Sequence, residues 1–156
     1  MLNILSSVLF SLKFTTFAFM KRILAIFCAF ATLVSSAAQP WRMRLRNSEE
    51  GVVLRIDLYE ESIDVPNMEL LGPMNGYLGG NGIYGVWMVT SFDIDNDKSA
   101  TLRLSNDLGS DTQQVRLTQQ TDSTYLMELQ GNVVVKKAVN RKLVKIAPKM
   151  MLQIMP

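Results

Sequence analysis

The chain has 156 residues, with 16 lysines and arginines, 14 aspartates and glutamates, one cysteine and no histidine. Without histidine, and with Cys28 alone, it cannot build a Ser-His-Asp or Cys-His catalytic site, a zinc site of the usual nitrogen and sulfur ligands, or a histidine proton switch. These exclusions favour a protein that acts by binding, and we expect no catalytic residue, no cofactor and no metal.

The N-terminal part of the chain reads as an export signal. A basic start at Lys21 and Arg22 precedes an apolar run over residues 23–34, and small residues at Ser36 and Ala38 complete a cleavage site. The alternative is a membrane anchor, but the apolar run is shorter than the roughly 20 residues that span a bilayer. The sequence therefore predicts a protein that is periplasmic, cell-surface or extracellular.

This signal is complete from Met20 onward, which divides the chain into two parts. We expect residues 1–38 to comprise an upstream extension, residues 1–19, followed by a signal peptide that is cleaved after Ala38. Residues 39–156 would then form a single domain. Membrane contact is expected only through an uncleaved leader.

Loss of the leader changes the net charge. Three basic residues lie in the leader, Lys13, Lys21 and Arg22, so the mature chain has 13 basic and 14 acidic residues and a net charge of −1. This balance gives no case for nucleic acid or for an anionic membrane as a partner of the whole domain.

Alternating apolar and polar residues predict strands from the start of the mature chain. Residues 41–46 and 52–59 alternate as two half-buried strands joined by a hairpin. Six glycines follow within residues 72–87, and a strand comes after them without any lysine between residues 66 and 97. This stretch therefore does not resemble a phosphate-binding loop, and we expect it to be a flexible crossing between two parts of the sheet.

A meander of strands is predicted from Tyr84 to the C-terminus. Phe92 is expected opposite Leu102 and Thr90 opposite Leu104, across a turn at residues 96–97. Gly131-Asn132 is interpreted as a hairpin turn. Later strands are expected at residues 115–117, 125–129, 133–135, 142–146 and 150–155, and the pattern leaves open whether Val133 and Val135 or Val134 and Ala138 face the core.

The predicted fold class is all-β. No segment has a helical period, and about eight or nine short strands would close as a single small antiparallel barrel or as a two-sheet meander. Gly85-Val86-Trp87 resembles the G-x-W element of the lipocalins and the wider calycin barrels. In lipocalins this element opens the first strand, whereas here two predicted strands precede it. The resemblance implies a barrel with Trp87 in its wall.

The acidic residues give a weak case for chemistry. Asp93, Asp95 and Asp97 match the first, third and fifth places of a calcium loop, but Lys98 and Leu104 occupy the places that need glycine and glutamate. Asp93 and Asp95 also lie on one strand face, so a carboxylate-dependent glycosidase remains a remote alternative.

Two basic segments could together form a basic strip if the first and last strands are neighbours. The residues of this strip are Arg42, Arg44, Arg46, Lys142 and Lys145. It would face an anionic partner, or it would be a solvated strand face whose lysines discourage edge pairing.

The function that we expect is a non-catalytic exported β domain that serves as a protein-interaction or structural module of the cell envelope. The alternative is a small calycin-like barrel that binds an apolar small molecule. Besides the basic strip, the candidate ligand or partner contacts are Tyr77, Tyr84, Trp87, Met88, Phe92 and Leu102.

Overall fold

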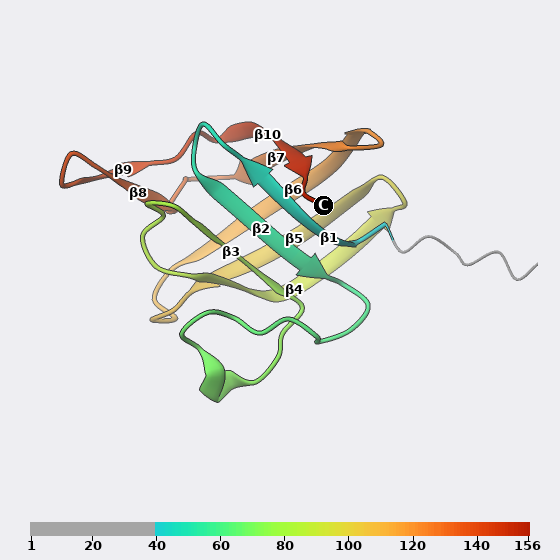
Figure 1. Cartoon of the computed structure of the whole chain (residues 1–156), viewed down its shortest axis with the longest axis horizontal. Helices are drawn as coiled ribbons and strands as arrows, with labels where there is room; N and C mark the ends of the chain where they lie inside the picture. Colours follow the sequence, from blue (N-terminus) through green and yellow to red (C-terminus); the bar gives the residue numbers. More distant parts are fainter. Residues whose placement is uncertain (1–39) are drawn as a thin grey trace, which may run out of the picture. The chain divides into compact units, whose positions relative to one another are not determined.

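Eight antiparallel strands close into a barrel in the computed structural model, which describes residues 40–156 (Figure 1). The barrel strands are β1 (Arg42–Asn47), β2 (Val52–Asp57), β3 (Gly76–Gly80), β4 (Trp87–Asn96), β5 (Ser99–Asn106), β6 (Thr112–Thr121), β7 (Thr124–Gln130) and β10 (Lys149–Ile154). Each strand pairs with the next along the barrel, and β10 returns to β1. The predicted all-β barrel is therefore confirmed, as an up-and-down barrel. The predicted signal peptide and cleavage site lie outside the described residues.

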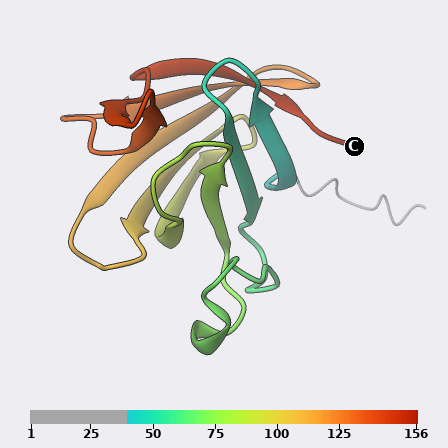
Figure 2. The same cartoon turned by 60° about the vertical axis from the view of Figure 1, so that its left-hand side comes forward.

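Two long links interrupt the meander. The link from β2 to β3 carries a short 3₁₀ turn, η1 (Glu69–Leu71), and the link from β7 to β10 carries a separate hairpin of β8 (Lys136–Val139) and β9 (Lys142–Lys145). Figure 1 and Figure 2 show the two links projecting from different sides of the barrel. Within residues 40–156 there is no helix of the length and apolar character needed to cross a membrane.

Large apolar side chains fill the barrel, because every second residue of most strands points inward. Trp41 packs edge-on against Tyr125, with 6.1 Å between the ring centroids. The alternation predicted this inward set on β5, β6 and β7. Its members there are Ala100, Leu102, Leu104, Val115, Leu117, Tyr125, Met127 and Leu129, all buried.

A bulge in β4 changes the predicted register. Phe92 pairs with Leu102 as expected, but Leu104 pairs with Val89, and the ladder shifts between Val89 and Ser91. The prediction that Thr90 lies opposite Leu104 is therefore wrong, because the bulge leaves Thr90 outside the ladder. Its hydroxyl instead donates a hydrogen bond to the carbonyl of Arg103, at 3.1 Å.

The glycine-rich stretch contains a strand of the barrel, so the prediction of a flexible crossing is wrong. β3 pairs with β2 from Gly76 to Gly80. Gly76 and Gly80 have φ angles of 152° and 140°. A Cβ atom on Gly76 would overlap the carbonyl oxygen of Arg55 on β2, and one on Gly80 would overlap the carbonyl oxygen of Gly51 in the turn before β2. Glycine is needed here for close approach, and its lack of a side chain hid the strand from the alternation.

The chain leaves the barrel after β7, so the predicted hairpin turn at Gly131-Asn132 is also wrong. The turn lies later, at Asn140 and Arg141, whose φ angles of 50° and 64° are those of a two-residue type I′ turn. The strand predicted at residues 133–135 is not formed, since β8 begins at Lys136; of the two alternatives that the pattern left open, Val133 and Val135 are the pair buried in the core.

Gly80→Ala should destabilise the domain by about 3 kcal/mol or more, because the new Cβ meets the Gly51 carbonyl and the φ angle is strained. Gly109→Ala is the matched control, since Gly109 also has a positive φ, 70°, but open space around it. Its cost should be about 1 kcal/mol. Urea unfolding of both variants measures the difference, and equal losses would contradict the close approach.

Candidate functional site

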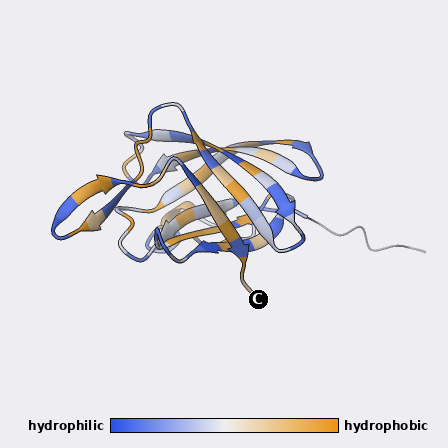
Figure 3. Ribbon diagram, turned by 90° about the horizontal axis from the view of Figure 1, so that it is seen from above, coloured by the Kyte–Doolittle hydropathy of each residue, from blue (hydrophilic) through white to orange (hydrophobic). Residues whose placement is uncertain are grey.

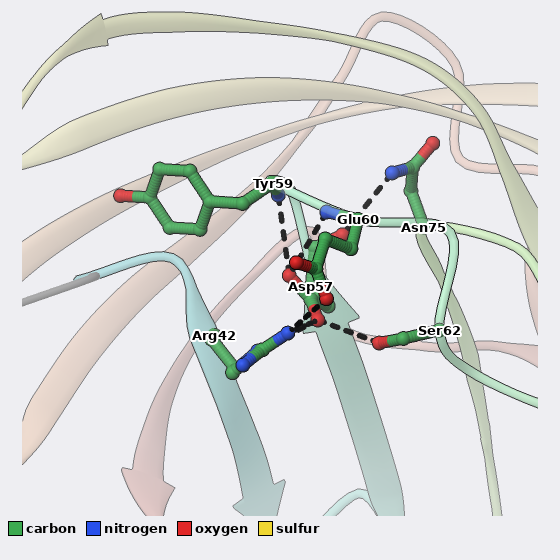
Figure 4. Close-up of polar contacts among 6 residues, drawn as sticks. All are labelled: Arg42, Asp57, Tyr59, Glu60, Ser62 and Asn75. Carbon is green, nitrogen blue, oxygen red and sulfur yellow. Dashed lines mark hydrogen bonds and ion pairs between the residues drawn. The ribbon is translucent and has the colours of Figure 1, made fainter.

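A buried carboxylate at the end of β2 is the centre of a polar network (Figure 4). The side chain of Asp57 accepts hydrogen bonds from Arg42 Nε at 2.7 Å and from Ser62 Oγ at 2.6 Å. Its other oxygen accepts the backbone N–H groups of Tyr59 and Glu60, both at 3.2 Å. Arg42 also donates to the Glu60 carboxylate, at 2.8 Å.

This network stabilises the fold more readily than it performs chemistry. Burial alone would raise the pKa of Asp57, but the hydrogen bonds from Arg42, Ser62 and the two backbone groups outweigh it and lower the pKa to about 2. A carboxylate that is so fully hydrogen-bonded is a poor proton acceptor. Its bonds tie β1 to β2 and hold the start of the β2–β3 link.

The domain should lose stability in acid through Asp57. A carboxyl whose pKa is lowered on folding contributes stability above its unfolded pKa, near 3.8, and loses that contribution as the pH falls through about 2. The contribution is about 2 kcal/mol. Urea unfolding measures the free energy of unfolding at pH 5 and at pH 2. The decrease between these two pH values should be smaller by this amount in Asp57→Asn than in the wild-type protein. An unchanged pH profile in that variant would contradict the role of the network.

The basic strip is divided between two sheets. The first and last strands are neighbours, since β1 pairs with β10, but Lys142 and Lys145 lie on β9, which pairs with β8. Arg42 forms ion pairs with Asp57 and Glu60 in the network described above. Arg44 lies directly opposite Arg55 on the outer face, and neither has an acidic partner within residues 40–156.

Arg55→Glu should stabilise the domain by about 0.5–1 kcal/mol, because it replaces a like-charged cross-strand pair with an oppositely charged one. Arg103→Glu is a control on an exposed position of β5. Its effect should stay within about 0.5 kcal/mol. Thermal and urea unfolding at low salt measure both, and a destabilised Arg55→Glu variant would contradict the repulsion between Arg44 and Arg55.

The predicted contact residues are spread over three places. Phe92 and Leu102 line a hollow of about 410 Å³ beside β4 and β5. Tyr77 and Met88 are opposite each other on β3 and β4, and Tyr77 lines a second hollow of about 520 Å³ together with Arg44. Tyr84 and Trp87 line a third hollow, which adjoins the second one at Gly85 and Asp107.

The hairpin end joins elements that are distant in sequence. We use this name for residues 82–87, 106–111 and 134–145. The N–H of Ala138 donates to the carbonyl of Gly82 at 2.7 Å, and the N–H of Tyr84 donates to the carbonyl of Lys136 at 2.9 Å. The glycine-rich stretch and one half of the basic strip therefore meet at one surface.

A buried glutamine fixes the base of the hairpin. Gln113 on β6 is 1% exposed, and its Oε1 accepts the N–H of Val134 at 3.0 Å while its Nε2 donates to the carbonyl of Gln130 at 2.9 Å. Val135 is buried beside it and accepts the N–H of Ile146, at 3.2 Å. An amide that is fully satisfied in the interior holds a segment in one place.

An ion pair adds a second point of attachment. Lys137 Nζ lies 2.7 Å from Glu50 Oε2, which belongs to the turn between β1 and β2. Both side chains are largely buried, at 23% and 16% exposure, so solvent screens this pair less than one on the open surface. The hairpin is thus mounted on the barrel at its base, and its turn projects beyond it (Figure 1).

A hollow of about 310 Å³ lies between the hairpin and the barrel. Tyr84, Trp87, Leu108 and Leu143 contribute apolar surface, and the polar groups in its wall include Asp107, Asp111 and Lys136. Trp87 is buried beneath it and its Nε1 donates to the carbonyl of Tyr84, at 3.4 Å.

Apolar and cationic side chains share the exposed part of the hairpin end. Residues 136–145 contain five basic residues and no acid. Besides the ion pair of Lys137, these cations have no acidic partner within residues 40–156. The exposed apolar side chains are Tyr84, Leu108, Val139, Leu143 and Val144. Figure 3 shows hydrophobic stretches along the hairpin and a hydrophilic tip.

The class that these observations define is an eight-stranded up-and-down barrel with a filled interior and a basic hairpin inserted before its last strand. Comparison with family models, curated proteins and solved structures finds no match to this chain. In the described part of the chain, no group of three or more acidic residues is placed to hold a metal ion.

Sequence reasoning missed the partners that mount the hairpin. Gln113 alternates with apolar residues on β6, at an inward position where a polar residue is unusual, and that was a usable signal. Leu108, in contrast, carries no signal, since a single leucine in a polar turn is common.

Proposed function

We propose that this chain is a non-catalytic, exported binding module that holds a protein partner at the hairpin end. The observation that carries the proposal is the exposure of three apolar side chains and of cations without an acidic partner on a hairpin that the barrel does not need for closure, next to the exposed Tyr84 and Leu108 of the barrel links. Exposed apolar groups that gather on a small domain commonly mark an interaction site. The leader in the sequence supports export to the cell envelope or beyond.

The filled interior favours a partner on the outside of the barrel. Trp87 and Leu102, two of the predicted ligand contacts, are 3% and 0% exposed. If the protein binds a small molecule instead, the binding site that we favour is the hollow below Tyr84 and no longer the barrel interior. That hollow, about 310 Å³, is at the lower end of the range for ligand pockets, roughly 300–1,000 Å³.

Site-specific photocrosslinking in the cells that make the protein tests the proposal. A benzophenone amino acid at Leu143 should give a crosslinked adduct of one defined mass, because this side chain would lie in the interface. The matched control is Leu71 on the β2–β3 link, since the two leucines are 48% and 56% exposed. Denaturing electrophoresis and mass spectrometry identify the adducts.

Charge reversal tests the cations in the same assay. The double variant Lys142→Glu, Lys145→Glu should reduce the adduct from position 143 by about tenfold or more. Adducts from position 71 alone would contradict the hairpin end as the site. A small molecule that co-purifies and is lost in Tyr84→Ser, with no protein adduct, would instead favour the small-molecule alternative.

A further inference from the structure

The outer edge of β9 has free backbone hydrogen-bonding groups. In a hairpin closed by a two-residue turn, Val139 and Lys142 form a hydrogen-bonded pair, and bonded and non-bonded pairs alternate from there. Lys136 and Ala138 therefore point their backbone groups away from β9, and these groups do bond to Tyr84 and Gly82. By the same alternation, the N–H and C=O groups of Leu143 and Lys145 point away from β8.

These outward groups of β9 have no partner in the described part of the chain. The bonds there involve neither the N–H nor the C=O of Leu143 or Lys145. β8 is thus hydrogen-bonded along both of its edges, to β9 and to residues 82–84, whereas β9 is hydrogen-bonded only along the edge that faces β8. An unpaired edge with exposed side chains is a template on which another strand can form.

The charge of the hairpin selects among the possible occupants of this edge. A second copy of the chain would place five cations against five, and like charges across an interface disfavour it. An anionic membrane fits poorly, because the part that projects farthest is Asn140-Arg141 and the apolar residues lie behind it, divided between both hairpin faces. An acidic segment complements the cations on both faces.

The apolar residues give such a segment side-chain contacts as well. Leu143 lines the hollow below Tyr84, and it lies on the same hairpin face as Lys136 and Lys145. A strand beside β9 would alternate its side chains between this face and the face of Lys142 and Val144. A segment that alternates acidic and apolar residues therefore matches both the charge and the surface.

We propose that β9 is a docking edge for an acidic, extended segment of a partner protein, which adds to the β8–β9 sheet as a third, antiparallel or parallel strand. This inference rests on the proposed function and adds the chemistry of the partner and its mode of binding. Backbone hydrogen bonds to Leu143 and Lys145 hold the segment, and the lysines select its charge.

The test uses the purified protein and a short synthetic peptide of alternating glutamate and valine. Hydrogen exchange measured by NMR should slow about tenfold or more at the amides of Leu143 and Lys145, while those of Lys142 and Val144, already bonded to β8, should change little. Affinity should fall with added salt. A peptide with lysine in place of glutamate should not bind.

Two matched substitutions separate backbone bonding from apolar contact. Leu143→Pro removes an outward N–H without removing a bond to β8, and it should weaken peptide binding about tenfold or more. Leu143→Ser keeps that N–H and should weaken binding less. A peptide that is N-methylated at alternate residues should bind as weakly to the wild-type protein as the normal peptide binds to Leu143→Pro.

Several results would overturn the docking edge. Equal binding of the normal and N-methylated peptides would show a charged surface without strand addition, and no peptide binding at all would remove the edge altogether. Binding to anionic vesicles but not to peptide, or dimers in sedimentation that Leu143→Pro abolishes, would assign the edge to a membrane or to a second copy. Adducts from position 143 would still report a protein partner at the hairpin end, so the two proposals fail separately.

Discussion

The seam between β1 and β10 is the contact on which the rest of the structure depends. Leu45 pairs with Ile154 and Arg46 with Gln153, and the N–H of Met155 donates to the carbonyl of Arg44 at 2.8 Å. These few bonds turn an open meander into a barrel without edges and enclose a core of large apolar side chains. Because the interior is filled, any partner has to be met on the outside.

The outer surface acquires its distinct feature from the way the last strand is reached. A tight turn after β7 would have led directly to β10, but the chain makes an excursion instead and forms a second, two-stranded sheet. Such a hairpin is marginally stable alone. Here the buried amide of Gln113, the bonds to Gly82 and Tyr84 and the ion pair with Glu50 hold its base. The proposed docking at its free edge would benefit from this fixed base, because little conformational entropy would be lost on binding.

The sequence predicted the barrel because most strands carry their inward residues at every second position, as from Ala100 to Leu104. It failed where this signal is absent. β3 is hidden because glycine replaces side chains at its close approach to β2, and the bulge at Thr90 leaves no trace in composition. At the site, Tyr84 and Lys142 could be chosen as exposed aromatic and basic residues. That their segments meet at one end of the barrel could not be predicted, since it depends on the bond between Gly82 and Ala138, which no local rule specifies.

The position of the seam also has a consequence for folding kinetics. Asn47 Nδ2 donates to the carbonyl of Met151, 104 residues further along, so the barrel closes through contacts between the two ends of the domain. Barrels that rely on such distant contacts fold slowly, on the order of milliseconds to seconds. A chain still being synthesised has no β10 to offer, and the edges of β1 and β7 remain open until it is complete. Open strand edges of this kind favour aggregation before the barrel closes.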